Sequence, residues 1–380
     1  MRQMVPSDKT VNDLQPGQPT EESRELADYL ILPFQIRTES QLANALKLAV
    51  RRTKERGCLV YWRLSARHQG TSQDLTLETI QNCAQANGWR LTSRNSAIIW
   101  PHSLGLVSRW INQFLGPLIP GACLTEVIVL RKIPSTKDRS CSIIVPARNE
   151  AGNLPELLDR IPHFGKSQEI ILIEGGSTDE TRQVADRESN ARPQQNIRVL
   201  AQKGRGKGSA MREALRACRG ELVFILDADL SVDPEALPSF YASITQDDVD
   251  FINGDRMTLP METGAMRWLN YWGNQCFTTL MNLQLGTHLS DTLCGTKVFY
   301  RDDFRTQNDG LPDIDPFGDF SLLLGTRSRH LRIKEVSVTY RARKYGKTNI
   351  QRWRDGLRLL RIWFHGLSLT RFISFKARSE

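Results

Sequence analysis

Two aspartates that follow a short apolar run are the residues of this sequence best suited to chemistry. The run Leu222–Leu226 leads directly into Asp227, Ala228 and Asp229. Such a run predicts a strand buried on both faces, and open α/β sheets bind ligands at the carboxyl ends of their strands. Carboxylates at i and i+2 supply the oxygen ligands that Mg²⁺ or Mn²⁺ prefers. The alternative is a pair of helix-start aspartates, since Asp is common at strand-to-helix turns.

Three further segments carry ligand or turn chemistry after strand-like runs. Their notable residues are, in chain order, Pro146, Arg148, Asn149 and Glu150, then Glu174, Gly175, Gly176 and Ser177, and then Lys203, Arg205 and Lys207. The last three alternate with glycines before a helix, which predicts a diphosphate cradle of cations, exposed amides and a helix N-terminus. Each segment alone is typical of turns. At the ends of consecutive parallel strands, together they predict one site.

Regularly spaced strands are needed to bring these segments together. Strand-like runs occur at 142–146, 169–174, 197–201 and 221–226, with helical segments between them. That alternation predicts βαβ units, right-handed crossovers and a mainly parallel sheet. We therefore expect an α/β fold for the second part of the chain.

Length and charge divide the chain further. Its 380 residues suggest two domains, or one domain with an appendage. The net charge is +9, but from Arg327 to Glu380 there are 15 Lys and Arg against 3 Asp and Glu, which is +12, so the remainder carries −3. The basic character belongs to the C-terminal segment. No nucleic-acid recognition motif accompanies it, and we expect no nucleic-acid partner.

Cysteine usage and hydropathy bear on the compartment. The seven cysteines are scattered without a CxxC pair, which indicates reduced thiols and neither a disulfide framework nor a zinc site. Residues 1–25 are polar and do not resemble a signal peptide, and no apolar run reaches the length of a membrane-spanning helix. We expect a cytoplasmic protein, peripheral at the inner face of the membrane.

The first part of the chain predicts a flexible tail over 1–25 and a small α/β domain over 26–135. Helices are expected over 41–56 and 75–87, with a strand CLVYW between them and edge strands RLTSR and LTEVIVLRK. The segment resembles the C-terminal portion of a class I methyltransferase fold. It has no glycine-rich loop for S-adenosylmethionine, so we interpret it as a degenerate, structural domain. The polar segment 133–140 is the expected boundary.

Residues 140–350 resemble a family 2 glycosyltransferase of the GT-A fold, on the motifs SIIVPARNEAGNL, EGGSTDET, GKGSAM and LDADL followed by DPE. The resemblance implies that Asp229 ligates a divalent cation on the diphosphate of a nucleotide-sugar, and that Asp227 contacts ribose or the cation shell. It places Pro146, Arg148, Glu150 and Glu174 around the nucleoside. Many relatives have DDGS where this chain has Glu174-Gly175-Gly176-Ser177, so the base recognised stays open.

The motifs FINGDRM, LSDTLCGTKVFYRDDF, DPFGDFSLLLG and RARKYGKTNIQRW look like those of polyprenyl-phosphate sugar transferases, such as dolichol-phosphate mannose and glucose synthases. The resemblance implies roles for residues of the second half: Arg256 near the cleft, Asp291 and Thr292 on the acceptor side, Gly295 as backbone room, and Arg343, Gly346 and Thr348 as the element that closes over the diphosphate. Relatives often end that element with Lys, where this chain has Asn349 and a nearby Lys347.

The predicted chemistry is inverting transfer of a sugar to a polyprenyl phosphate. A cation on Asp229, with Arg343 and the 203–207 loop, would stabilise the charge that develops on the nucleotide diphosphate. A lipid phosphate is already anionic, whereas a hydroxyl acceptor needs a base, for which Asp319 is the candidate. Asp319 is equally interpreted as a helix cap. Two different functions also stay open: transfer to a soluble or lipid hydroxyl, and a catalytically silent, membrane-associated nucleotide-sugar-binding protein.

Residues 351–380 predict a basic amphipathic helix. Arg354, Arg358, Arg361 and His365 fall in one arc of a helix, and the opposing apolar face is formed by Trp353, Leu357, Leu360, Trp363, Phe364 and Leu367. A basic helix with tryptophans is typical of a membrane interface. The alternative is a helix that packs its apolar face on the transferase core and leaves a solvated basic stripe.

Overall fold

The computed structural model describes residues 11–13, 26–32, 36–64, 75–97, 125–135, 138–266, 268–304, 315, 317–343, 345 and 352–370. The chain forms two compact units. The first contains the described residues up to Ser135, and the second contains those from 138 to 370. The division falls within the polar segment 133–140.

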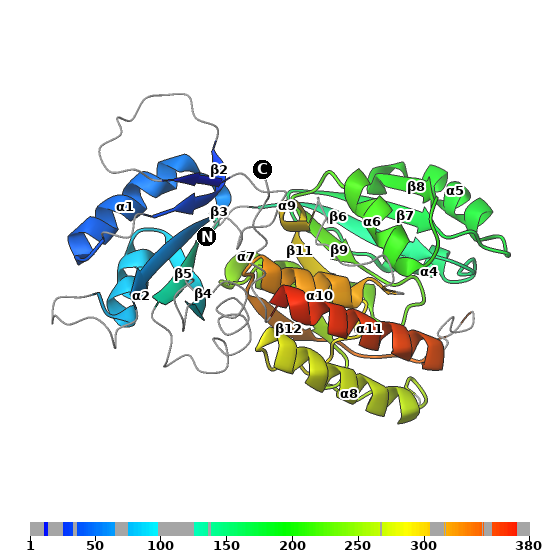
Figure 1. Ribbon diagram of the computed structural model, residues 1–380. Coiled ribbons are helices and arrows are strands. Elements are labelled where there is room, and N and C mark those ends of the chain that lie inside the picture. The colour runs from blue at the N-terminus through cyan, green and yellow to red at the C-terminus, as the bar shows by residue number, and fades with distance from the viewer. Residues whose placement is uncertain are drawn as a thin grey trace. The chain divides into compact units, whose positions relative to one another are not determined.

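The first unit is a five-stranded sheet covered on one face by two helices (Figure 1). The strand order is β1-β2-β3-β5-β4. The strands are β1 (Val11–Asp13), β2 (Ala27–Ile31), β3 (Thr53–Leu64), β4 (Trp89–Ala97) and β5 (Thr125–Lys132), and the helices are α1 (Glu39–Arg52) and α2 (Leu77–Ala86). Thr38 caps α1 with Gln41 in a capping box, and Gly88 adopts a φ of +76° after α2, as a helix-ending glycine does. The fully buried Trp89 lies within the core that the helices cover.

Three expectations for this unit need correction. The first helix ends at Arg52, not Arg56, because Thr53 already takes extended backbone and begins β3. Strand β5 is interior, since it pairs with β3 and β4 on its two sides, and its residues 127–130 are all buried. Residues 11–13 of the expected tail form β1, which pairs with β2. The methyltransferase interpretation of this unit stays a prediction.

The second unit is built on a seven-stranded sheet in the order β12-β10-β11-β9-β6-β7-β8. Its strands are β6 (Ser140–Ala147), β7 (Ser167–Glu174), β8 (Ile197–Ala201), β9 (Leu222–Ile225), β10 (Phe251–Asp255), β11 (Lys297–Tyr300) and β12 (Ile333–Ser337). Strand β11 is antiparallel to both of its neighbours, and every other pairing is parallel. The predicted α/β fold with a mainly parallel sheet is confirmed, and the four expected strands lie at the expected places.

Alternation along the central strands divides the core into two layers. Ile143 and Val145 of β6 face one layer and Ile144 faces the other, as the period of a strand requires. The first layer is covered by α4 (Leu154–Arg160), α5 (Thr181–Ala191) and α7 (Leu237–Gln246). The second is covered by α6 (Lys207–Ala217), α8 (Trp268–Leu285), α9 (Arg301–Phe304), α10 (Asp319–Ser328) and α11 (Arg352–Thr370) (Figure 1).

Helix α11 packs on this second layer with a face that overlaps the predicted apolar face only in part, at Trp363. Leu359 and Ile362 are buried in the core, and the indole N–H of Trp363 donates to the carbonyl of Leu280 at 2.9 Å. Leu357 and Phe364, which belong to the predicted apolar face, are instead 68% and 59% exposed. Contacts with α8 and α10 set the rotation of α11, so the packing interpretation holds for part of the helix.

Among the described residues, none of the helices has the length and apolar character needed to cross a bilayer. Six of the seven cysteines are described, all as free thiols, and only Cys276 of these is exposed. Cys123 lies outside the described residues.

Candidate active site

Asp227 and Asp229 lie just after β9, and each is paired with a cation from a distant segment. Lys207, the first residue of α6, donates from Nζ to Asp227 Oδ1. Arg343 donates from Nη2 to Asp229 Oδ2. The backbone N–H of Ser231 also donates to Asp229 Oδ1 at 3.0 Å, which fixes that carboxylate. Burial opposes the ionised form of Asp227, but Lys207, together with Lys297 and Arg256, outweighs burial and lowers the pKa of Asp227.

Gly295 provides the room for this cluster, as predicted. A Cβ added at this position would lie 2.0 Å from Asp227 Oδ2 and 2.9 Å from Lys207 Nζ. Real Cβ atoms do not approach other atoms so closely, so any larger residue here would displace the carboxylate and the ammonium. The backbone at Gly295, just before β11, therefore lies directly against the side chains of Asp227 and Lys207.

Glu150 lies beside Asp229 and forms the third acidic group of the site. Its side chain accepts from Asn153 Nδ2 at 2.6 Å, and its Oε1 lies 3.9 Å from Arg343 Nη1. Burial raises the pKa of Glu150 to about 7, further raised by Asp229 and opposed by Asn153 and Arg343. The neighbouring Asn149 has a φ of +58°, which turns the chain from β6 into α4. Glu150 is thus poised to exchange a proton near neutral pH.

The β7 end is a closed turn. Glu174 accepts at 2.6 Å from the backbone N–H of Ser177, and Ser177 Oγ accepts at 3.0 Å from the backbone N–H of Asn149. Gly176 takes a φ of +68°, a conformation that favours glycine. Glu174 and Ser177 therefore hold the β6 and β7 loops together. Pro146 lies within β6 and is partly buried, while Arg148 is exposed next to it.

The 203–207 loop divides into two parts. Lys203 and Arg205 are exposed, and the loop backbone is held by Glu213, which accepts from the N–H groups of Lys203 and Gly204 at 2.8 and 2.9 Å. Lys207 alone of the three cations reaches the acidic pair. The role of Lys203 and Arg205 on a diphosphate stays a prediction.

On the predicted acceptor side, Arg256 and Asp291 form a bidentate ion pair. Arg256 Nε and Nη2 donate to Asp291 at 2.7 and 3.0 Å, and the guanidinium lies 4.9 Å from the centroid of the Tyr340 ring. The positive charge of Arg256 is among the causes that lower the pKa of Asp227, after Lys207 and Lys297. Asp291 and Thr292 are fully buried, and Asp291 contacts Arg256 through its carboxylate; their place on an acceptor stays a prediction.

Asp319, the candidate base, is engaged by a cation that the sequence analysis did not single out. Lys297 Nζ donates to Asp319 Oδ1 at 2.8 Å and also to the carbonyl of Cys294. The side chain of Lys297 is completely buried and that of Asp319 is 7% exposed. The interpretation of Asp319 as a helix cap is wrong, because Gly318 is the N-cap residue of α10 and Asp319, the first residue of the helix, makes no side-chain capping bond. Its role as a base stays a prediction. To act as a base, Asp319 would have to accept a proton on a carboxylate that already accepts a hydrogen bond from the Lys297 ammonium.

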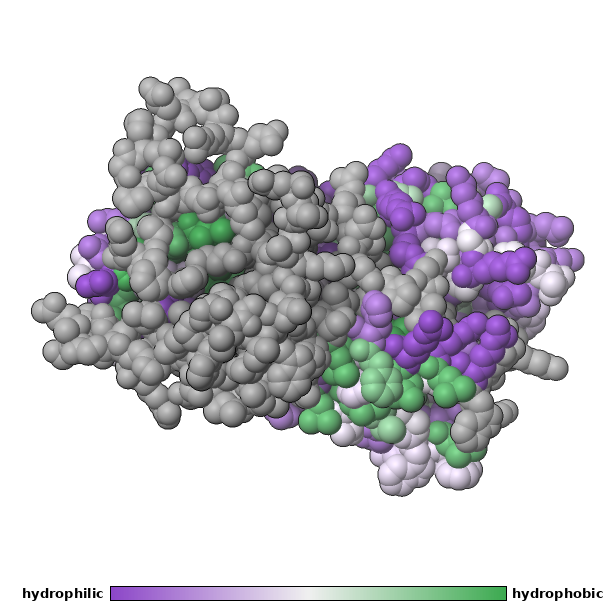
Figure 2. All heavy atoms as spheres, viewed as in Figure 1, coloured by the Kyte–Doolittle hydropathy of each residue, from purple (hydrophilic) through white to green (hydrophobic). Residues whose placement is uncertain are grey.

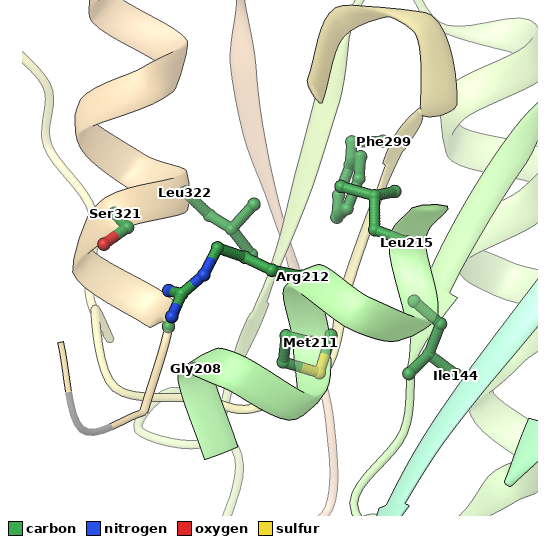
Figure 3. Close-up of a pocket in the computed structure, with 9 residues that line it drawn as sticks. Ile144, Gly208, Met211, Arg212, Leu215, Phe299, Ser321 and Leu322 are labelled. Atoms are coloured by element: carbon green, nitrogen blue, oxygen red, sulfur yellow. The ribbon is translucent and has the colours of Figure 1, made fainter. Parts of the chain in front are cut away.

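A small crevice lies next to the site, between α6 and α10 (Figure 3). It is lined mainly by apolar side chains, and Arg212 extends across it toward the turn of α10 that carries Ser321 and Leu322. None of the predicted site residues lines it. A Cβ on Gly208 would lie 2.5 Å from the carbonyl of Asp315, so here the starts of α6 and α10 pack backbone to backbone. This contact holds Lys207 near Asp319.

No group of three or more His, Cys, Asp or Glu side chains in the described part of the chain is arranged to hold a metal. The two carboxylates after β9 nevertheless fit a cation that takes the rest of its shell from a ligand, because they are hard oxygen donors and Mg²⁺ commonly binds one or two protein carboxylates plus phosphate oxygens and water. Gly346, Lys347, Thr348 and Asn349 lie outside the described residues.

The sequence analysis also missed a surface formed by α8 and α11, which we call the aromatic–basic surface. The residues 268–285 contain no charged side chain. Five large apolar side chains of this surface stay more than half exposed: on α8, Trp268 (70%), Trp272 (65%) and Leu283 (59%), and on α11, Leu357 (68%) and Phe364 (59%). Figure 2 shows hydrophobic and near-neutral residues gathered in the region where Figure 1 places α8 and α11, bordered by hydrophilic ones. The feature of the sequence that could have indicated this surface is an uncharged helical segment with tryptophans four residues apart, Trp268 and Trp272.

Helix α11 adds cations to this surface. Arg354 and Arg361 are exposed, and they alternate along the helix with the exposed Leu357 and Phe364. The spacings of three and four residues place all four on one side of the helix. Of the predicted basic arc, Arg354, Arg361 and His365 are exposed, whereas Arg358 is partly buried and paired with Asp355; apolar side chains share the face.

The residues 142–307 match the model of glycosyl transferase family 2. The chain is 30% identical over 224 residues to the glycosyltransferase AglJ of Haloferax volcanii, an alignment that covers 58% of this chain and 69% of AglJ. The chain belongs to glycosyltransferase family 2. Membership of the family and the mainly parallel sheet confirm the predicted GT-A fold class.

Further family members that the chain resembles include two transferases. It is 27% identical to the low-salt glycan biosynthesis hexosyltransferase Agl6 of Haloferax volcanii, covering 58% of this chain and 52% of Agl6. It is 28% identical to the dolichyl-phosphate beta-glucosyltransferase of Dictyostelium discoideum, covering 52% and 65%. The chain thus spans about half the length of Agl6, and 37% of glycosyltransferase AglD.

Among solved structures, the chain is similar to glucosyl-3-phosphoglycerate synthase of Mycobacterium tuberculosis in complex with Mg²⁺ and uridine diphosphate. The identity is 19%, the TM-score is 0.47, and the match covers 61% of this chain and 80% of the synthase chain.

The buried carboxyl of Glu150 leads to a prediction on pH. Its pKa lies near 7 in the folded state against an ordinary value of 4.5, so the folded state binds the proton more tightly. Its contribution to stability is complete below pH 4.5 and is lost as the pH rises through 7. We expect Glu150→Gln to be more stable than the wild type at pH 8, by about 2–3 kcal/mol, and the difference to shrink toward pH 4.5.

Urea unfolding of the metal-free protein at pH 5 and pH 8 measures this difference. Glu213→Gln is the matched control, for which the change in the free energy of unfolding should have the opposite sign. Burial opposes ionisation of Glu213, but the N–H groups of Lys203 and Gly204 lower its pKa. That substitution should destabilise the protein at pH 8. A Glu150→Gln variant that is less stable than the wild type at pH 8 would show that Glu150 is charged and satisfied in the folded state.

Proposed function

We propose that this protein is a metal-dependent, inverting glycosyltransferase that moves a sugar from a nucleotide-sugar to a polyprenyl phosphate. The observation that carries the proposal is the pairing of Lys207 with Asp227 and of Arg343 with Asp229 at the end of β9. Two carboxylates that could hold a cation and two cations that could bind phosphate oxygens thus lie together at the end of one strand. Relatives named as polyprenyl- or dolichyl-phosphate sugar transferases support the acceptor class.

Asp227 and Asp229 would hold Mg²⁺ or Mn²⁺, which would supply positive charge to the diphosphate leaving group. With a metal on these carboxylates, Lys207 and Arg343 would be the cations able to donate to phosphate oxygens. Fixed cations of this kind stabilise the charge that develops on the leaving group as the bond to the sugar breaks. Attack by an acceptor phosphate oxygen on the anomeric carbon, from the side opposite the nucleotide diphosphate, would invert the configuration at that carbon.

The Lys297–Asp319 pair favours a phosphate acceptor over a hydroxyl. A hydroxyl must lose a proton to a base, and Asp319 is held by a completely buried ammonium at 2.8 Å. A phosphate oxygen is already anionic near neutral pH and needs no base. Arg256, oriented by Asp291, is a cation on this side that would receive it.

A ligand screen tests the proposal. The melting temperature of the full chain is measured with Mn²⁺ and a panel of uridine and guanosine diphosphate sugars, because a ligand that binds only the folded state raises it. The stabilising donors are then incubated with farnesyl phosphate or with farnesol. We expect a glycosylated product with farnesyl phosphate as the acceptor and none with farnesol. Product from farnesol alone would assign transfer to a hydroxyl, and donor binding without product from either acceptor would assign the silent binding protein.

The aromatic–basic surface supports a peripheral membrane location. Tryptophan favours the headgroup region of a bilayer, and each cation near an anionic surface adds about 1 kcal/mol of attraction. We expect the double variant Trp268→Ser/Trp272→Ser to lose most of its co-sedimentation with vesicles containing phosphatidylglycerol. Leu26→Ser, an exposed apolar residue of the first unit (48%), is the control and should sediment like the wild type. Undiminished sedimentation of the double variant would exclude α8 from membrane contact.

A further inference from the structure

Helix α8 has a second face, which points into the protein and carries polar side chains. Asn274 and Thr278 are one helical turn apart and are 2% and 4% exposed, while the aromatic side chains Trp268 and Trp272 occupy the outer face. Buried polar groups are costly unless they are hydrogen-bonded. Their partners therefore show what the inner face of α8 does.

Those partners are the two residues of the predicted acceptor side. Asn274 Nδ2 donates to Asp291 Oδ1 at 2.9 Å. Thr278 Oγ1 lies 3.1 Å from Thr292 Oγ1 and accepts from the backbone N–H of Thr292 at 3.3 Å. Helix α8 is thus bonded directly to Asp291 and Thr292.

Asp291 passes this constraint on to Arg256. Asp291 Oδ1 receives both the Asn274 amide and Arg256 Nη2, and Asp291 Oδ2 receives Arg256 Nε. A planar guanidinium bound in this bidentate way has its orientation set by the carboxylate. Two of its five N–H groups donate to Asp291 and the side chain also bonds Tyr340, so an anion would be received on the N–H groups that remain. The backbone N–H groups of Leu293 and Arg256 also donate to Asp291, at 3.0 and 3.2 Å, so Asn274 is the side-chain tie by which α8 contributes to the direction of Arg256.

We propose that Asn274 is a positioning residue for the acceptor: it ties Asp291, and through it Arg256, to the helix whose outer face meets the lipid surface. This inference rests on the proposed function, since it takes a polyprenyl phosphate as the acceptor. Its consequence is that the lipid-facing side chains and the phosphate-binding guanidinium move as one unit. An acceptor anchored in the bilayer then presents its phosphate at a fixed offset from Arg256.

The experiment measures binding of farnesyl phosphate, a water-soluble polyprenyl phosphate, to the full chain by calorimetry. Asn274→Leu removes the amide donor, and Asn274→Asp keeps the side-chain shape but places a second carboxylate beside Asp291. We expect the Kd for farnesyl phosphate to rise about tenfold in Asn274→Leu, as loss of one charge-assisted hydrogen bond allows, and further in Asn274→Asp. Binding of uridine or guanosine diphosphate with Mn²⁺ should be unchanged in both, which a general loss of structure would not permit.

Gln284→Leu is the matched control. Gln284 is a buried amide on the same helix, 3% exposed, but its Nε2 donates toward the carbonyl of Trp363 in α11. This control should bind farnesyl phosphate like the wild type. Trp268→Ser/Trp272→Ser should also bind soluble farnesyl phosphate normally while losing affinity for undecaprenyl phosphate in vesicles, because only the outer face is altered.

A wild-type Kd for farnesyl phosphate in both Asn274 variants would overturn the inference while leaving the proposed function intact. Failure of the wild type itself to bind any polyprenyl phosphate would overturn the proposed acceptor and this inference with it. If Asn274→Leu does not fold, the isosteric Asn274→Asp decides between these outcomes.

Discussion

Asp229→Asn is expected to lower sugar transfer by about 100- to 1000-fold, the loss typical of removing one group that stabilises transition-state charge. The substitution keeps the shape of the side chain but removes the charge that would hold the metal and that now holds Arg343. The amide can still accept from the backbone N–H of Ser231, so the local turn should survive. The measurement is kcat/KM at saturating Mn²⁺, together with Mn²⁺ affinity from electron paramagnetic resonance.

Asp233→Asn is the control for this substitution. Asp233 lies four residues further along and is likewise ion-paired, with Arg160 and Arg341, but neither cation is a predicted site residue. Its loss should affect stability slightly and Mn²⁺ affinity not at all. Equal losses of transfer in the two variants would mean that the acidic segment acts through its fold, and an active Asp229→Asn variant would remove Asp229 from the metal site.

Lys297→Met is expected to destabilise the protein by about 3–5 kcal/mol, the usual cost of leaving one partner of a buried ion pair without the other. The ammonium of Lys297 is completely buried, and it bonds both Asp319 and the carbonyl of Cys294. Without it, the Asp319 carboxylate would remain at the start of α10 with its main counter-ion gone. Equilibrium urea unfolding of the wild type and the variant gives the difference in the free energy of unfolding.

The double variant Lys297→Met/Asp319→Leu tests the pair itself. Replacing a buried ion pair by apolar side chains is often close to neutral, so we expect the double variant to recover most of the stability that the single variant loses. A double variant as unstable as Lys297→Met would show that Lys297 acts through Cys294 rather than Asp319. Stability restored with transfer to farnesyl phosphate retained would exclude Asp319 as an obligatory base, whereas stability restored with transfer lost would keep it.

The corrected interpretation of α11 shows where periodicity stops being informative. A helical wheel of residues 352–369 offers several apolar side chains over a wide arc, and nothing local ranks Leu359 and Ile362 above Leu357 and Phe364. The choice is made by the surfaces that α8 and α10 present, and these bury the first two and leave the others exposed. The same packing leaves α11 with an outer face that carries both basic and apolar side chains. The prediction had placed the basic and the apolar residues on separate sides of the helix.

Much of the second unit was determined by its sequence alone. Each central strand is a short run of β-branched and apolar residues, and each loop after it has residues that only a turn or a ligand requires. Local preference and hydrophobic pattern therefore agree at Ile143, Ile171 and Val223, which leaves little choice of fold. The acidic pair after β9 follows from the same local logic, whereas the room at Gly295 was implied by the family resemblance alone.

Only the tertiary structure decided which charges meet. Lys207 and Asp227 are 20 residues apart, Arg343 and Asp229 are 114 apart, and Lys297 and Asp319 are 22 apart. No local pattern encodes such pairings, because they depend on the order of strands in the sheet and on the close packing of α6 against α10. For the same reason Asn274 was invisible in the sequence: a neutral amide on an uncharged helix acquires its role only when the fold places it against Asp291.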